Sequence, residues 1–153
     1  MPEDPQSIAS PERDPQQFLT YRLARLQSRL NAQAIRRLRE NSDLSLTEWR
    51  ILAMLAPQGE TTLSMLVRDT QLDKGQLSRA TKTLMTKGLL QSRVKADDHR
   101  QNLLTITKSG KATHDKIIPV MQARQSVLAA HLSKDELAGF LSVLTKLERA
   151  TDT

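Results

Sequence analysis

The sequence predicts a mainly α-helical protein of the α+β class, built around a winged helix-turn-helix with flanking dimerisation helices. Three observations predict this fold: helix start signals recur along the chain, residues 73–88 have the pattern of a short amphipathic helix, and two strand-like runs follow that helix. Two short helices joined by a tight turn, the second with a polar face, are typical of DNA-binding units. We divide the chain into a flexible tail (1–13), an N-terminal dimerisation helix (14–44), a winged helix-turn-helix domain that binds DNA (45–107) and C-terminal dimerisation helices (108–153).

The amphipathic helix has both of its ends marked in the sequence. Asp73 suits the N-cap position, Gln76 can complete a capping box, and Gly88 suits the left-handed residue that ends a helix. The face expected to pack on a core holds Leu77, Ala80, Thr81, Leu84 and Met85. The opposite face carries side chains that can read base edges, and we expect DNA contacts from Lys74, Gln76, Ser78, Arg79 and Lys82. A solvated amphipathic helix is the alternative.

The strand-like runs around residues 89–94 and 103–106 enclose a segment too polar to pack, which we interpret as the tip of a wing. Arg100 is expected in a minor groove, where A·T-rich steps concentrate negative potential, and Asp98 is expected to orient its guanidinium group. The expected DNA contacts of the wing are Arg93, Lys95, Asp98, His99 and Arg100. The alternative is an ordinary exposed hairpin. The amphipathic helix that precedes the segment makes this alternative less favoured.

The excess positive charge lies on this helix and wing. The chain has 153 residues and a net charge of +6, and residues 73–111 hold nine Lys or Arg against three Asp, while the remainder holds fourteen charges of each sign. Such a concentration favours double-stranded DNA as partner. Binding to a membrane surface would need Trp or Phe beside these charges, and residues 73–111 contain neither. The chain has no Cys and no long apolar run, and its start lacks a signal-peptide pattern, so we expect a cytoplasmic protein without thiol chemistry.

Leucine seams flank the winged domain. With Asp14 as N-cap, a long helix is expected from Pro15 to Glu40, and its Leu residues recur at close to 3.5-residue spacing. A second seam follows the Ser133–Glu136 capping box. We expect these seams to form a homodimer through Leu19, Leu23, Leu26, Leu137, Leu141 and Leu144. The alternative for the first seam is packing within its own chain.

Further start signals place the remaining helices. Ser45 and Glu48 form a capping box with Leu44 and Trp49 as its hydrophobic staple, and Thr61 or Thr62 opens a short helix. Thr107 or Ser109 begins a long helix that should run to about His131 and be bent, or have a freed carbonyl, at Pro119.

The order of these residues resembles the MarR (multiple antibiotic resistance regulator) family of winged helix-turn-helix transcription regulators. The resemblance covers about residues 45–110 and rests on Ser45-x-x-Glu48-Trp49, Leu63-x-x-Leu66, Leu72-Asp73-Lys74-x-x-x-Ser78-Arg79, Leu84-x-x-x-Gly88-Leu89-x-x-x-Arg93, and Asp98-x-Arg100 followed by Gly110. It departs from the family at His99, where a second basic residue is usual, and at Val67, where Ala is usual. Because histidine side chains in general titrate near neutrality, we expect His99 to weaken the wing contact or make it pH-sensitive.

The resemblance implies an obligate, triangular homodimer that binds a pseudo-palindromic operator, with Ser78 and Arg79 on the major-groove face and Arg100 as the wing arginine. It also implies a repressor that a small ligand releases, often an aromatic or phenolic acid held between the dimer helices and the winged core. Candidate ligand residues are Arg22, Arg25, Trp49 and His114, for which surface exposure or a core position is the alternative. An architectural or protein-interaction module without a ligand response is the alternative function.

Catalytic and metal-binding patterns are missing from the sequence. It contains no Gly-rich phosphate loop and no nucleophile elbow, so we expect no enzyme activity and no cofactor. The three histidines, at positions 99, 114 and 131, lack further ligands at helical spacing. His114 and Asp115 are adjacent, and adjacent helical residues are not expected to face the same way. We therefore expect no metal site.

Overall fold

The computed structural model describes residues 14–94 and 102–152, and it confirms the predicted fold class. The tail expected at 1–13 and the wing tip expected at 95–101 lie outside the described residues. After a 3₁₀ turn at Pro15–Gln17, the described elements are α1 (Leu19–Asn41), α2 (Leu46–Gln58), β1 (Glu60–Thr62), α3 (Leu63–Thr70), α4 (Lys74–Thr86), β2 (Leu90–Val94), β3 (Asn102–Ile106), α5 (Lys108–Ala129) and α6 (Lys134–Thr151).

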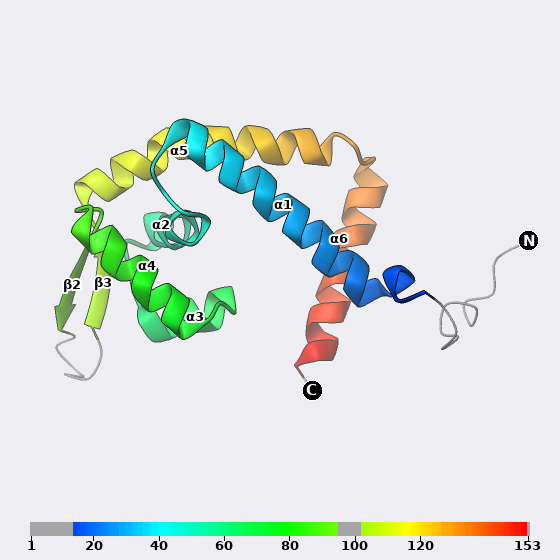
Figure 1. Ribbon diagram of the computed structural model, residues 1–153, viewed down its shortest axis with the longest axis horizontal. Coiled ribbons are helices and arrows are strands. Elements are labelled where there is room, and N and C mark those ends of the chain that lie inside the picture. Colours follow the sequence, from blue (N-terminus) through cyan, green and yellow to red (C-terminus); the bar gives the residue numbers. More distant parts are fainter. Residues whose placement is uncertain (1–13, 95–101, 153) are drawn as a thin grey trace, which may run out of the picture.

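Helix α2 forms the centre of the core. Its residues Ile51, Leu52 and Leu55 have no exposed surface. They belong to a cluster that also contains fully buried side chains from the four surrounding helices, namely Leu38, Leu66, Leu77, Leu84 and Ile117. Figure 1 shows the resulting arrangement, in which the winged domain lies at one end and α1 and α5 extend from it.

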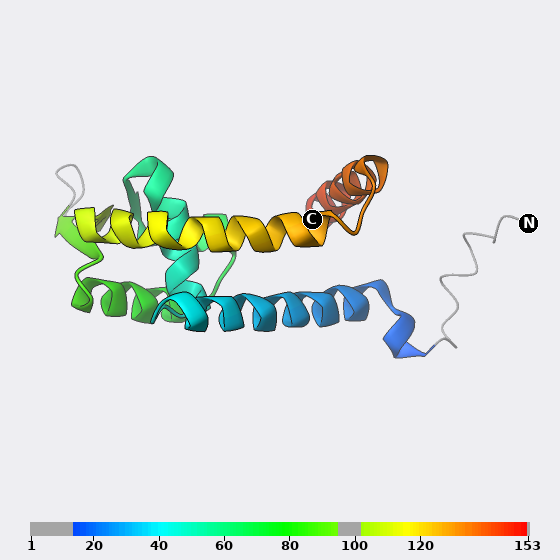
Figure 2. The same ribbon diagram turned by 90° about the horizontal axis from the view of Figure 1, so that it is seen from above.

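Helix α6 lies outside this core. It has no buried residue. It overlaps α1 in Figure 1, but Figure 2, seen from above, shows the two helices at different depths. The helix before it, α5, continues as one helix through Pro119. No described helix combines the length and the apolar character that a membrane span requires.

The predicted helix starts at Ser45, Thr62, Thr107 and Ser133 are confirmed. Each of these side chains accepts a hydrogen bond from the backbone N–H three residues later, and Ser45 and Ser133 form complete capping boxes with Glu48 and Glu136. The short polar residue at each start satisfies an N–H group that the helix leaves without an internal partner.

The first helix begins later than predicted. Asp14 does cap, with Oδ1 accepting from the N–H of Gln16 at 3.0 Å, but it caps only the 3₁₀ turn. Phe18 then has an extended backbone, with φ −64° and ψ 136°, and α1 starts at Leu19. An N-cap followed by proline specifies a first turn, and it does not determine whether the next turn continues it.

The sheet contains one strand more than the predicted two-stranded wing. The strand order is β1-β3-β2 with antiparallel pairs, and Leu104 of β3 lies between Thr61 of β1 and Ser92 of β2. Strand β1 has only three residues, Glu-Thr-Thr, which is too short to show the alternation of apolar and polar residues that predicts a strand. It forms because the free edge of β3 supplies backbone hydrogen-bonding groups.

A close helix–strand contact depends on Gly110 in the first turn of α5. A Cβ atom at this position would collide with the carbonyl oxygen of Leu89 and lie 2.9 Å from Cγ1 of Ile106. Gly139 in α6 has no atom within 4 Å of the corresponding Cβ position. The same substitution is therefore expected to have opposite effects at the two sites.

We predict that Gly110→Ala lowers the free energy of unfolding by about 2–4 kcal/mol, because the backbone of Leu89 must shift to make room. Gly139→Ala should raise it by about 0.5–1 kcal/mol through higher helix propensity. Urea unfolding followed by circular dichroism, at equal protein concentrations, measures both changes. Equal stability of the two variants would contradict the close contact at Gly110.

Candidate nucleic-acid interface

Helix α4 is held with its apolar face inward and its polar face outward. Leu77, Ala80, Thr81 and Leu84 are buried. Of the five residues predicted to contact DNA, Lys74, Gln76, Arg79 and Lys82 are exposed, and Ser78 is half-buried. The helix thus presents cationic and polar side chains over most of the surface that does not face the core.

The C-terminal end of α4 follows the predicted glycine signal. Gly88 has φ +73°, the N–H of Gly88 donates to the carbonyl of Met85 at 3.0 Å, and the N–H of Leu89 donates to that of Leu84 at 2.9 Å. These two bonds form a Schellman motif. The chain can therefore turn directly from α4 into β2.

A hollow of about 280 Å³, lined by both polar and apolar side chains, lies between α4, the start of α3 and the strands of the wing. Ser78 faces this hollow together with Lys74 and Lys82 of α4, and Ser92 and Asn102 line it from the strands. Two lysine side chains beside several hydroxyl and amide groups can bind a phosphate oxygen. The hollow brings together predicted site residues of α4, and adds Ser92 and Asn102, which the sequence analysis did not single out.

One predicted wing residue can be described. Arg93 is exposed in β2, and its Nη2 atom lies 3.4 Å from Oε2 of Glu60 in β1. An exposed ion pair of this kind contributes at most about 1 kcal/mol and leaves the guanidinium group free to exchange partners. Lys95, Asp98, His99 and Arg100 lie outside the described residues.

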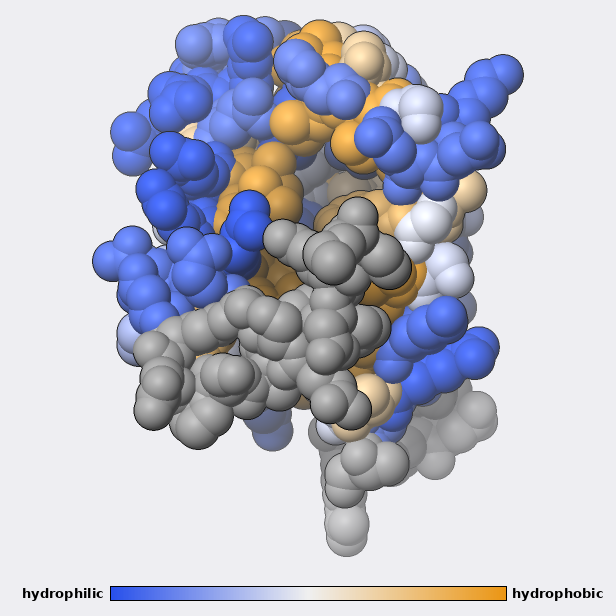
Figure 3. All heavy atoms as spheres, turned by 90° about the vertical axis from the view of Figure 1, so that its right-hand side faces the viewer, coloured by the Kyte–Doolittle hydropathy of each residue, from blue (hydrophilic) through white to orange (hydrophobic). Residues whose placement is uncertain are grey.

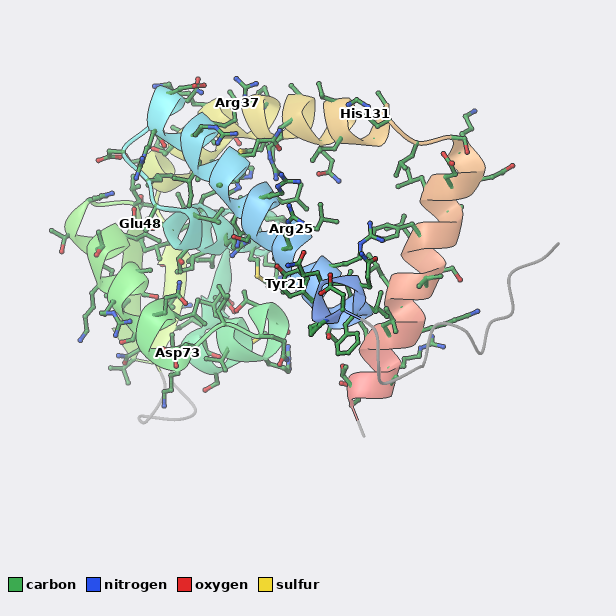
Figure 4. All side chains as sticks on the ribbon, turned by 45° about the vertical axis from the view of Figure 1, so that its right-hand side comes forward. Tyr21, Arg25, Arg37, Glu48, Asp73 and His131 are labelled. Atoms are coloured by element: carbon green, nitrogen blue, oxygen red, sulfur yellow. The ribbon has the colours of Figure 1, made fainter. Side chains whose placement is uncertain are left out.

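The first turn of α2 is bonded to both ends of α4. Near the start of α4, Nε2 of Gln76 donates to Oγ1 of Thr47 at 2.8 Å. At its end, Nζ of Lys87 donates to Oε2 of Glu48 at 2.8 Å and to the carbonyl of Asp43 at 3.0 Å. Figure 4 shows Glu48 at this junction and Asp73 at the start of α4.

These bonds correct one prediction. Asp73 caps α4 as expected, accepting from the N–H of Gln76 at 2.9 Å. The side chain of Gln76 does not complete a capping box, because its amide is bonded to Thr47 of another helix. A tertiary partner has replaced the local one.

Residues 42–101 match the sequence model described as the MarR family. This segment of the chain, which contains the predicted helix-turn-helix, therefore has the sequence pattern of that family. The predicted resemblance is confirmed, and members of this family are DNA-binding transcription regulators rather than enzymes. No curated protein matches the sequence significantly.

Solved structures of MarR-family proteins share the fold over most of the chain. Bordetella bronchiseptica BpsR, whose DNA binding is regulated by 6-hydroxynicotinic acid, has 21% sequence identity and a TM-score of 0.81, covering 89% of this chain and 96% of its own. S. aureus MepR in complex with DNA has 20% identity and a TM-score of 0.81, covering 88% and 98%. A MarR-family regulator from Silicibacter pomeroyi has 25% identity and a TM-score of 0.72, covering 86% and 88%.

The structure also has a largely apolar cavity of about 580 Å³ among α1, α2, α5 and α6. The polar side chains on its wall include Asn31, Arg50 and Arg124, and no acidic residue of the described chain lines it. Arg50 donates to Oδ1 of Asn31 at 2.9 Å, and Arg124 donates to Oε1 of Gln33 at 2.9 Å and to the carbonyl of Leu30 at 2.8 Å. Partial burial lowers the pKa of the Arg124 guanidinium group, and the charge of Arg50 lowers it further. An anion in the cavity would offset both effects.

Only one of the four candidate ligand residues lines this cavity. Trp49 is buried in its wall, and the ring of His114 stacks behind Trp49 with 5.5 Å between ring centroids. Arg22 and Arg25 are exposed on α1 and are not among the described lining residues. Sequence reasoning missed Arg50 and Arg124, which lie 74 positions apart in the chain and carry no shared motif.

The side chains of His114 and Asp115 lie differently from the prediction. Nδ1 of His114 lies 3.0 Å from Oδ1 of Asp115, so the expectation that these adjacent side chains face apart is wrong. The rotamers of these two side chains turn their polar atoms toward each other across the angle between neighbouring helical positions. In the part of the chain that the structure describes, no three His, Cys, Asp or Glu residues form a group that could hold a metal ion.

The predicted dimerisation residues lie on exposed or half-buried faces of the single chain. Leu19, Leu26 and Leu141 are 55%, 45% and 53% exposed, and Leu23, Leu137 and Leu144 are half-buried. Figure 3 shows hydrophobic side chains gathered around a hollow at the end of the molecule opposite the winged domain. Labels in Figure 4 mark Tyr21 and Arg25 on α1 and His131 at the end of α5, whereas Arg37 lies on α1 near the winged domain.

We predict that Lys87→Met lowers the free energy of unfolding by about 2–3 kcal/mol, because it leaves the buried carboxylate of Glu48 without its cation. The double variant Glu48→Gln/Lys87→Met should recover most of this loss. Arg37→Met is the matched control, because Arg37 pairs with Glu40 at the surface, 3.4 Å away, and should change stability by less than about 0.5 kcal/mol. Urea denaturation measures all three, and equal losses for Lys87→Met and Arg37→Met would contradict the assignment.

Proposed function

We propose that this regulator is a homodimeric repressor that binds a pseudo-palindromic operator and is released by a small aromatic or phenolic acid. The observation that carries the proposal is the orientation of α4. Its apolar side packs into the core of the winged domain, while Lys74, Arg79 and Lys82 remain exposed. A major groove admits such a helix, and arginine can read guanine in a bidentate manner. The comparison with S. aureus MepR, which was solved in complex with DNA, supports this use of the fold.

In this proposal the residues of α4 and the wing have different roles. Arg79 and Gln76 read base edges, whereas Lys74, Ser78 and Lys82 bind phosphates from the hollow beside the wing. Arg93, Lys95 and His99 contact the backbone. Arg100 enters a minor groove, with Asp98 orienting it.

The apolar faces support a homodimer. Single exposed apolar residues are ordinary, but α1 and α6 expose several each at helical spacing, including Leu19 and Leu26 on α1 and Phe140 and Val143 on α6. Burying these faces against a second copy removes them from water. The two-fold axis of such a dimer would then separate the two copies of α4 by about one turn of DNA, roughly 34 Å.

The cavity supports a carboxylate ligand. Its wall is mostly apolar, which suits an aromatic ring, and Arg50 and Arg124 can pair with a carboxylate. BpsR is regulated by 6-hydroxynicotinic acid, which has this chemistry. Arg50 also belongs to α2, whose first turn is bonded to α4, so a ligand that moves α2 changes the position of the recognition helix.

We predict that Arg79→Ala lowers affinity for the operator by about 1–3 kcal/mol and relaxes the choice of base, because a bidentate contact to one base is lost. Lys82→Ala should weaken binding to all duplexes alike and reduce the salt dependence, because a phosphate contact is lost. Fluorescence anisotropy on a palindrome from the protein's own promoter and on scrambled DNA, each over a range of salt concentrations, measures both.

Wild-type protein is the control for these measurements. Its mass in sedimentation equilibrium should be that of two chains, and its affinity for the palindrome should exceed that for scrambled DNA. A ratio near one would favour an architectural module over a sequence-specific regulator. Equal losses for Arg79→Ala on both duplexes would contradict the role of Arg79 as a base reader.

We predict that 6-hydroxynicotinate or salicylate binds the wild-type protein and that Arg124→Gln weakens this binding by about tenfold or more, because a charge-assisted bond to the carboxylate is lost. Isothermal titration calorimetry measures the affinities. Arg25→Gln is the matched control, since Arg25 is exposed on α1. A loss on Arg25→Gln with none on Arg124→Gln would show that the first helix holds the ligand instead.

A further inference from the structure

Gln76, in the first turn of α4, is fixed by two hydrogen bonds, one from its backbone and one from its side chain. The backbone N–H of Gln76 donates to Oδ2 of Asp73 at 2.9 Å, and the side-chain Nε2 donates to Oγ1 of Thr47 at 2.8 Å. Gln76 is exposed, whereas Thr47 is only 9% exposed. A residue on the outer surface of α4 is therefore tied to a hydroxyl group in the interior of the domain.

The free atoms of this amide are the ones that adenine recognition uses. A glutamine amide has two N–H donors and an acceptor oxygen. The bond to Thr47 occupies one N–H, and it leaves the second N–H for N7 of adenine and Oε1 for the N6 amino group. Residues near the N-terminus of a recognition helix are those that contact base edges. Gln76 occupies such a position.

We propose that Thr47 is a positioning residue that sets base specificity, because its hydroxyl group holds the amide of Gln76 in the orientation that reads adenine. This inference rests on the proposed function, since it requires α4 to enter the major groove. An unrestrained glutamine loses rotamer freedom when it binds, whereas a tethered amide has already lost it. Thr47 therefore acts on DNA recognition without touching DNA.

Removing the hydroxyl group of Thr47 should free the amide without displacing the helix. The other end of α4 remains bonded through Lys87 to Glu48, and the core side of α4 remains packed through Leu77 and Leu84, which have no exposed surface. Valine has nearly the shape of threonine and lacks the acceptor. Thr47→Val should therefore release the amide of Gln76 from its orientation and leave α4 in place.

The test is selection of preferred sequences from random duplex DNA by the purified full-length protein. Affinities are then measured on the selected duplex and on duplexes changed at one position. The variants are Thr47→Val, Thr47→Ser, Gln76→Ala and the double variant Thr47→Val/Gln76→Ala. Thr81→Val is the matched control, because the hydroxyl group of Thr81 bonds to the carbonyl of Leu77 within α4.

We expect the wild-type protein to prefer adenine at one position of each half-site by about tenfold or more, and Gln76→Ala to remove this preference. Thr47→Val should reduce it about threefold to tenfold, and the double variant should lose no more than Gln76→Ala because the two residues act as one unit. Thr47→Ser, which keeps the hydroxyl group, and Thr81→Val should retain the wild-type preference.

Two results would overturn the inference and leave the proposed function intact. One is a Thr47→Val protein that keeps the adenine preference or weakens binding to every duplex equally, which indicates a purely structural role. The other is a Gln76→Ala protein with wild-type base preferences. A wild-type protein without any base preference would overturn the proposed function and this inference together.

Discussion

Burial of α2 is the constraint on which the rest of the structure depends. From Leu46 to Ala56 every residue of this helix is buried or half-buried. Helices α1, α3, α4 and α5 all contribute fully buried side chains to the cluster around it. Because a close-packed core transmits small displacements, a movement of α2 must alter the elements packed on it. The position of the recognition helix is therefore a property of the whole core.

Four successive residues of α2 connect different parts of the molecule. Thr47 and Glu48 are bonded to α4, Trp49 stacks on His114 of α5, and Arg50 is bonded to Asn31 of α1. Successive helical residues point in directions about 100° apart, so one turn reaches three of the four neighbouring helices, α1, α4 and α5. This turn forms part of the wall of the apolar cavity and is bonded to α4, so the cavity and the proposed recognition helix share one turn of α2.

The cationic groups form two regions with different physical behaviour. The lysine and arginine side chains of α4 are exposed, so their attraction to a polyanion is long-ranged and weakened by salt. Arg50 and Arg124 are half-buried beside an apolar cavity, where screening is weaker. Under the proposed function, DNA and a small acid would therefore not compete for the same side chains.

The sequence by itself determined the starts of the helices after α1, the glycine that ends α4, and the apolar and polar faces of that helix. These features depend on residues within one turn of each other, such as Asp73 with the N–H of Gln76, so local spacing reveals them. Only the tertiary structure decided that β1 joins the sheet, that Gln76 bonds to Thr47, and that Arg50 and Arg124 share a cavity. Each of these contacts joins residues far apart in the chain, and a local pattern cannot encode a partner that folding alone brings near.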